Sequence, residues 1–356
     1  MAKTEIKVKG AKKIAKNEVI PFTRQLASML GAGMTILASI QTLEEQCANP
    51  EFKKVLQHLS EVIEGGEPLS AGLTDFPVLF DEMYVNMVIA GEQSGEFAPI
   101  MKRLAQIMSS ASRLRKKVKS AMTYPTVIVS IALCLAGGLI QFVVPVFAEM
   151  FAGFGKPLPM LTQKLVDVSD FVKSWWYIIV PCVIAAAWLF RKWKKTERGR
   201  LKFDEWMLKL PVFGILNQKS AIGRFCRLLS QMVAAGVPIL KSLKVVAGSL
   251  GNCVLEKSIL AARLEVEQGN QIGPSLEGKP YIPVLMVRML AAGEKAGKVE
   301  DMLDSVADAY DEEVEALLAT LTSLMEPFLM VFLGAIIGTI VLAMFLPIFN
   351  MGSLAS

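Results

Sequence analysis

The chain has 356 residues and a formal net charge of +5, and 53% of its residues are hydrophobic. Its mean hydropathy is positive, which is unusual for a soluble domain, and the apolar residues are concentrated at 126–147, 175–190 and 327–349. The basic residues gather beside these stretches, so the net charge gives no reason to expect nucleic-acid binding. One histidine and five scattered cysteines offer neither a zinc site nor a catalytic triad, and we expect a protein that is not an enzyme.

In chain order, a short basic segment over 1–20 precedes a series of helices that are separated by glycine and proline residues. These helices are expected at 22–30, from 35 to just before 49, and at 51–64, 69–73 and 81–90. After Gly95, apolar residues recur at steps of three and four, which predicts one long amphipathic helix that continues into the membrane. Residues 21–120 are therefore expected to form a first cytoplasmic helical domain.

The apolar stretches are suited to crossing a bilayer, which takes roughly 20 helical residues. We expect transmembrane helices at 124–148, 175–193 and 326–349, with an external loop at 149–174 and an external tail at 350–356. Basic clusters before the first helix and after the second indicate that both of these ends face the cytoplasm. The approach to the third helix is acidic, so its direction rests on the number of crossings.

The second half of the chain repeats the first. Ala-Gly-Glu-Gln-Ser-Gly at 90–95 returns as Ala-Gly-Glu-Lys-Ala-Gly at 292–297. Further matched pairs are Phe22 with Phe225, Arg24 with Arg227, Leu26 with Leu229, and Pro125 with Pro327. Because a repeat sets the fold, residues 200–322 are expected to form a second cytoplasmic helical domain. The predicted fold class is an all-α membrane protein with two repeated helical bundles, of about six helices each, and three transmembrane helices.

Residues 273–280, Gly-Pro-Ser-Leu-Glu-Gly-Lys-Pro, match the beginning of a phosphate-binding loop. That loop needs a serine or threonine after the lysine to hold magnesium, and a strand before it. Pro280 occupies the position of the magnesium ligand, and no strand is predicted upstream. We therefore expect no nucleotide and no other cofactor.

Glu92 and Glu294 occupy the same place in the two copies. Glycines on both sides of each would allow a tight turn before the long helix, and the carboxylate would then lie near the N-terminus of that helix, where unpaired amides favour it. Two hypotheses remain open. Each glutamate is either a structural carboxylate inside the bundle or a functional one, as a charged contact with a partner or a weak cation site shared between copies.

Ala132 and Ala136 in the first expected transmembrane helix correspond to Gly334 and Gly338 in the third. Small residues four positions apart let helices approach closely in lipid, where packing drives association. Coincidence among spans rich in small residues is one explanation. The occurrence at equivalent positions favours a packing face, and we expect a homo-oligomer.

Several motifs resemble the inner-membrane platform proteins of type IV pilus assembly and type II secretion. They are Phe-Thr-Arg-Gln-Leu-Ala at 22–27, Ala-Gly-Glu-x-x-Gly in both copies, Thr-Tyr-Pro at 123–125, and Phe-x-Gly-Phe-Gly at 151–155. The resemblance extends from Phe22 to Phe349. Residues 80–84, Phe-Asp-Glu-x-Tyr, and the loop sequence are more similar to the pilus branch than to the secretion branch.

The resemblance implies a non-enzymatic platform in the bacterial inner membrane, with both large domains in the cytoplasm. It also implies the partners: a cytoplasmic assembly ATPase, pilins or pseudopilins, and other inner-membrane assembly proteins. A type II secretion platform is the alternative within the family. A membrane transporter is the alternative of a different class, because repeats with membrane spans are common among transporters.

Overall fold

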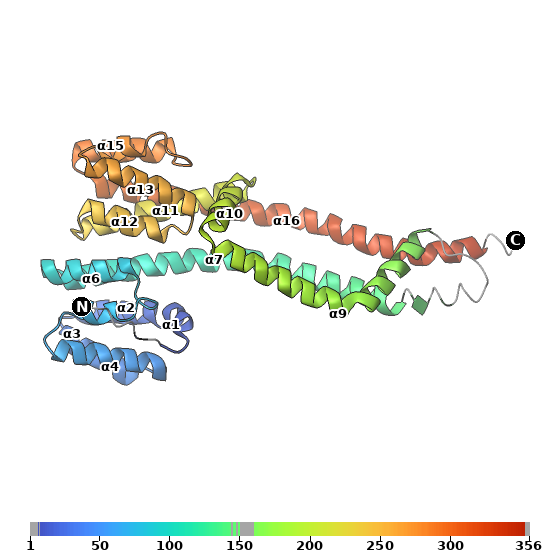
Figure 1. Ribbon diagram of the computed structural model, residues 1–356, viewed down its shortest axis with the longest axis horizontal. Helices are drawn as coiled ribbons and strands as arrows, with labels where there is room; N and C mark the ends of the chain where they lie inside the picture. Colours follow the sequence, from blue (N-terminus) through green and yellow to red (C-terminus); the bar gives the residue numbers. More distant parts are fainter. Residues whose placement is uncertain (1–5, 7, 144, 147–148, 150–159, 353–356) are drawn as a thin grey trace. The chain divides into compact units, whose positions relative to one another are not determined.

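The computed structural model describes residue 6 and the ranges 8–143, 145–146, 149 and 160–352 (Figure 1). Every element in these residues is a helix, and no strand occurs among them. The all-α fold class is therefore confirmed for this part of the chain. The residues divide into two compact units, Met1–Arg115 with Leu201–Val314, and Lys116–Arg200 with Glu315–Ser356.

The first half of unit 1 is a series of short helices with local capping signals. They are α1 (Ala11–Asn17), α2 (Val19–Gly31), α3 (Ile36–Gln46), α4 (Pro50–Glu64), α5 (Leu69–Thr74), α6 (Glu82–Ser94) and the start of α7 (Phe97–Gly138). Thr35, Asn49 and Asp81 accept backbone N–H bonds with their side chains at the starts of α3, α4 and α6. These caps explain why the helix starts could be predicted closely, since the signal is local.

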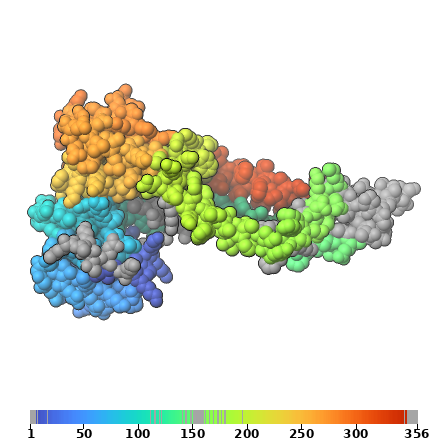
Figure 2. All heavy atoms as spheres, in the orientation of Figure 1, coloured from blue at the N-terminus to red at the C-terminus, as the bar shows by residue number. Residues whose placement is uncertain are grey.

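The second half of unit 1 comprises α10 (Glu197–Lys209), α11 (Phe213–Ala234), α12 (Ile239–Ser249), α13 (Cys253–Glu267), α14 (Ile272–Leu276), α15 (Val284–Ala296) and the start of α16 (Val299–Gly352). Helices that follow one another from α11 to α15 contact each other, and Figure 1 shows this group in yellow and orange. Phe225, Leu229, Ile259 and Leu290 are fully buried within it. The space-filling view shows the same helices as a densely filled body (Figure 2).

Unit 2 contains the remainder of α7, a short π-helix at Leu139–Val143, α9 (Met160–Lys195) and the remainder of α16. Within it, α9 and α16 share a buried hydrogen bond, in which Thr162 Oγ1 of α9 donates to the carbonyl oxygen of Ala343 in α16 at 2.5 Å. Among the described residues, two segments are long and apolar enough to cross a membrane, Lys116–Gly138 and Val299–Ala343. The span expected at 175–193 lies within α9, outside these two segments, and stays a prediction. The whole loop motif at 151–155 and the end of the tail lie outside the described residues.

Candidate functional site

Glu92 lies in the last turn of α6 and not at the start of the long helix α7. The helix continues through Gly91, where an added Cβ would be only 3.1 Å from Cδ2 of Phe97. The chain turns at Gly95, whose φ of 72° is in the left-handed region. The expected turn at both glycines is therefore wrong. Gly91 allows α6 and the first residue of α7 to pack closely, and Gly95 alone makes the turn.

The Glu92 carboxylate binds a different helix from the one the sequence suggested. The Ser70 backbone N–H donates to Oε1 of Glu92 at 3.0 Å, and Ser70 Oγ donates to Oε2 at 2.5 Å. Ser70 is the second residue of α5, and the first amides of a helix have no partner inside it. A half-buried carboxylate from α6 therefore satisfies the N-terminus of α5.

Glu294 makes the corresponding contact in the second half. Its carboxylate accepts hydrogen bonds from the backbone N–H groups of Ile272, at 2.6 Å, and Gly273, at 2.8 Å, at the start of α14. Gly273 lies so close to α15 that an added Cβ would be 2.7 Å from Cβ of Ala291. The segment that resembles a phosphate-binding loop thus has its first amide, that of Gly273, bound to a carboxylate of the chain itself, together with the amide of the residue before it.

The two halves differ most in the charge around their matched arginines. Arg227 of α11 contacts three aspartates of α16, with guanidinium–carboxylate distances of 3.4 Å to Asp304, 2.5 Å to Asp308 and 3.0 Å to Asp311. Burial lowers the pKa of the Arg227 guanidinium, but hydrogen bonds to Asp308 and Asp311 outweigh this effect and raise its pKa overall. The arginine therefore stays charged and holds α11 against α16.

Arg24, the matched residue in the first half, is exposed and donates to Ser109 Oγ at 3.1 Å. Beside it, the hydroxyl groups of Thr23 and Tyr84 lie 3.1 Å apart in the core. Burial raises the pKa of the Tyr84 hydroxyl, so this pair is a neutral hydrogen bond and not an acid–base site.

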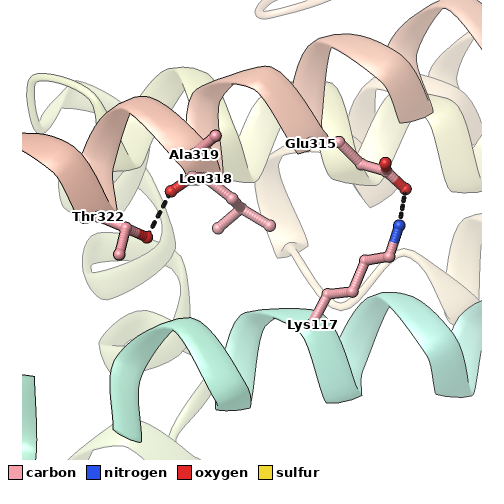
Figure 3. Close-up of a pocket in the computed structure, with 5 residues that line it drawn as sticks. All are labelled: Lys117, Glu315, Leu318, Ala319 and Thr322. Atoms are coloured by element: carbon pink, nitrogen blue, oxygen red, sulfur yellow. Dashed lines mark hydrogen bonds and ion pairs between the residues drawn. The ribbon is translucent and has the colours of Figure 1, made fainter. Parts of the chain in front are cut away.

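A shallow groove in unit 2 is lined by Lys117 of α7 and by Glu315, Leu318, Ala319 and Thr322 of α16 (Figure 3). Lys117 and Glu315 form an ion pair across it. Both side chains are about half exposed, so the pair contributes at most about 1 kcal/mol. Thr322 Oγ1 donates to the carbonyl oxygen of Leu318 at 2.8 Å and is thereby occupied within its own helix. The groove lies between two helices, and its lining supplies no group suited to binding a ligand other than the Lys117–Glu315 ion pair.

The small residues of the expected packing face lie in two different surroundings. Ala132 and Ala136 are buried within unit 2, at 5% and 9% exposure. An added Cβ at Gly334 or Gly338 would meet no described atom within 4 Å. The glycine pair is therefore open toward other molecules in the described part of the chain, and the packing face stays a prediction.

Two features of the site were not predicted from the sequence: the aspartates around Arg227 and the partner of Glu92. The spacing of Asp304, Asp308 and Asp311 places them on one face of α16, and this period could have indicated a shared basic partner. The partner of Glu92 could not be read from spacing, because it depends on how α5 packs against α6. Among the described residues, no group of three or more His, Cys, Asp or Glu side chains could hold a metal ion.

Comparison with known proteins gives full-length matches. The family model described as type II secretion system (T2SS), protein F matches the chain twice, over residues 22–145 and 225–347. Type IV pilus assembly protein PilC of Pseudomonas aeruginosa is 37% identical over 353 residues, which is 99% of this chain and 94% of that protein. PilC of Thermus thermophilus is 39% identical over 330 residues, covering 92% of this chain and 81% of that protein.

Relatives named for secretion are also found. Type II secretion system protein F of Vibrio cholerae is 31% identical over 344 residues, covering 96% of this chain and 84% of that protein. Its match, like those of the pilus proteins, extends over both halves of the chain. These findings confirm the resemblance noted in the sequence, and the chain belongs to the family of type II secretion system protein F.

Proposed function

We propose that this chain is the inner-membrane platform of a type IV pilus assembly machine. In this role it couples a cytoplasmic ATPase motor to the movement of pilin subunits from the membrane into the filament. The observation that carries the proposal is its similarity to PilC proteins of three bacteria, at 37–39% identity over nearly the whole chain. Proteins named for type II secretion are less similar, at 29–31%, and a secretion platform is the alternative.

The contacts within the chain support a role in binding and mechanical coupling rather than in catalysis. Glu92 and Glu294 are occupied by amides of neighbouring helices, and Arg227 is occupied by aspartates. Each of these charged groups stabilises the packing of two helices. A protein of this kind supplies surfaces for a motor and for membrane subunits, and the motor supplies the hydrolysis of ATP.

Three membrane spans form part of the proposal. Val331 of α16 is 73% exposed and Phe142, in the π-helix that follows α7, is 74% exposed, as expected of side chains that face lipid. In α9, Ile184 and Leu189 are also exposed, and Lys192 follows them with its ammonium 5.2 Å from the centre of the Trp188 ring. Aromatic and basic residues at the end of an apolar helix are typical of the membrane interface, which supports α9 as the middle span.

A transporter is less consistent with these spans. Transporters place ionisable groups near the middle of the bilayer, where such groups bind the substrate or the coupling ion. The stretches 126–147 and 327–349 contain no Asp, Glu, Lys or Arg, so they lack such a site. The platform proposal needs none, because its cargo is a protein that already lies in the membrane.

Deleting the gene from its native bacterium tests the proposal directly. Surface pili should be lost while export of type II substrates is unchanged, and the wild-type gene should restore the pili. The opposite pattern would favour the secretion alternative. Pili that persist together with normal export would contradict both platform roles.

The arrangement across the membrane is tested separately by single cysteines in the full-length protein. In a variant that lacks the five native cysteines, cysteines at positions 102, 220 and 300 should react with an impermeant maleimide only from the cytoplasmic side, and those at 160 and 354 only from outside. Labelling of position 220 or 300 from outside would overturn the proposed topology.

A further inference from the structure

The helix that follows α9 carries an exposed surface that is both apolar and basic. Trp206 of α10 is 58% exposed, and Val212, Phe213 and Ile215 at the start of α11 are 36%, 46% and 47% exposed. Lys202 and Lys209 of α10 are exposed as well. We call these six residues the α10–α11 corner. Figure 2 shows the surface of this part of the chain in yellow-green.

The opposite face of α10 is fixed to the rest of unit 1. Asp204 and Leu208 are buried, and the Asp204 carboxylate accepts a hydrogen bond from the backbone N–H of Cys253 at 2.8 Å, at the start of α13. Asn252 Nδ2 donates to the carbonyl oxygen of Asp204 at 3.4 Å. Because α10 is held on this side, a rotation that turned Trp206 inward would break these contacts.

The backbone of the corner is strained at Val212, directly before the apolar residues at the start of α11. Val212 has a φ of 63° and a ψ of −55°, a conformation that β-branched residues rarely adopt. The Phe213 N–H donates to the carbonyl oxygen of Pro211 at 2.7 Å, which closes a tight three-residue turn of a strained type. Strain of this kind persists only where the surroundings hold it, and it often marks a functional position.

The corner belongs to only one of the two copies. α11 begins at Phe213, twelve residues before Phe225, whereas α2 begins at Val19, three residues before the matched Phe22. In the first copy α1 takes the place of these first turns, and the positions that match Val212, Phe213 and Ile215 are Lys9, Gly10 and Lys12, so the apolar corner occurs only in the copy that follows α9. The corner is therefore a feature of the segment that follows α9, and not of the helical bundle that the two copies share.

We infer that the α10–α11 corner inserts into the headgroup layer of the cytoplasmic leaflet, an anionic lipid surface. The inference rests on the proposed function, because it takes α9 as a membrane span. Trp206 follows the end of α9 at Lys195 by eleven residues, two of them steps through the break at Thr196 and the rest along α10, so it lies at most about 20 Å from the end of α9 and within reach of the interface. Tryptophan and lysine together suit this layer, since the ring lies among headgroups while the ammonium contacts lipid phosphate.

The chemistry of the corner favours lipid over a protein partner. Val212, Phe213 and Ile215 are near neighbours in the chain at a tight turn, and Lys202 and Lys209 lie one turn on either side of Trp206. The Lys209 ammonium is paired with Glu205 at 2.6 Å but its side chain is 62% exposed, so lipid phosphate can still reach it. A shallow apolar tip flanked by basic residues is the pattern of interfacial anchors, which bind through apolar burial and attraction to anionic lipids. The anchor would hold the second half of unit 1 close to the membrane.

Site-specific photocrosslinking in the full-length protein tests the inference. The photoreactive residue p-benzoylphenylalanine replaces Trp206 or Phe213, and the protein is reconstituted in vesicles of phosphatidylethanolamine and phosphatidylglycerol. Leu264 of α13 is the matched control, because it is apolar and 56% exposed but distant in sequence from α9. Val183 of α9, 62% exposed, is the control for the span itself.

We expect lipid adducts at positions 183, 206 and 213, with yields at 206 and 213 at least fivefold above that at 264. Lipid adducts at 183 without adducts at 206 and 213 would overturn the interfacial anchor and leave the proposed function intact. Crosslinks from 206 or 213 to the motor or to a second copy, in native membranes, would overturn it in favour of a protein interface. Absence of lipid adducts at 183 would contradict α9 as the middle span. The result at 183 therefore distinguishes a failure of the proposed membrane arrangement from a failure of the interfacial anchor alone.

Discussion

Replacing Glu294 with Gln tests whether the matched carboxylates serve the fold or a partner. The carboxylate of Glu294 accepts two backbone N–H bonds, from Ile272 and Gly273, and these amides have no other partner inside α14. A glutamine keeps one acceptor oxygen but turns an NH₂ group toward the second amide. One charge-assisted hydrogen bond is then lost, and a donor faces a donor.

The size of the effect follows from these contacts. A hydrogen bond to a charged group contributes about 1.5–3 kcal/mol, so Glu294→Gln should cost about 2 kcal/mol of unfolding free energy. For a unit of this size, that corresponds to a fall in Tm of roughly 4–8 °C. Glu92→Gln should be milder, at about 1 kcal/mol or less. The reason is that Ser70 Oγ, which donates to Glu92, can instead accept a hydrogen bond from the new NH₂ group.

The assay is thermal unfolding of the full-length variants in one detergent at one scan rate, paired with a count of surface pili. A structural role predicts a larger fall in Tm for Glu294→Gln than for Glu92→Gln. The number of pili should then fall only in proportion to the loss of stability of each variant. An unchanged Tm in Glu294→Gln together with a complete loss of pili would refute this reasoning. It would establish a partner contact or a cation site at that carboxylate.

Two further predictions concern the matched arginines and the glycine pair. Arg227→Met leaves three aspartates without their cation and should lower the free energy of unfolding by about 2 kcal/mol. Arg24→Met removes one exposed hydrogen bond and should change that free energy by less than about 0.5 kcal/mol. Equal Tm values for the two variants would contradict a stabilising role of the aspartate cluster. Changing both Gly334 and Gly338 to Leu should weaken self-association without affecting membrane insertion, because the larger side chains fill a face that the described chain leaves open. Unchanged crosslinking and mass in detergent would count against that packing face.

The sequence predicted the helices well wherever the signal is local. Asn49 before Pro50 and Asp81 before Glu82 mark helix starts through their own side chains, and the structure has caps at both. The long helix after Gly95 also follows from the spacing of its apolar residues, which form one continuous face. Signals of this kind need no knowledge of the tertiary structure.

The predictions that depended on tertiary packing were less accurate. Gly91 and Gly95 look alike in the sequence, but one allows close packing inside a helix and the other makes a turn. The partner of Glu92 lies 22 residues away on another helix. Val212 could not be identified as strained, because its residue type normally avoids positive φ.

The two copies keep one contact that builds the fold and differ in the charge of their long helices. Glu92 and Glu294 bind the starts of matched short helices in the same way, yet the long helices differ in charge. Residues 113–119 of α7 contain five basic side chains, while residues 311–315 of α16 contain four acidic ones. One partner surface would therefore attract one copy and repel the other. We expect the two halves to bind different surfaces of the assembly machine, because their long helices carry opposite charge at these positions.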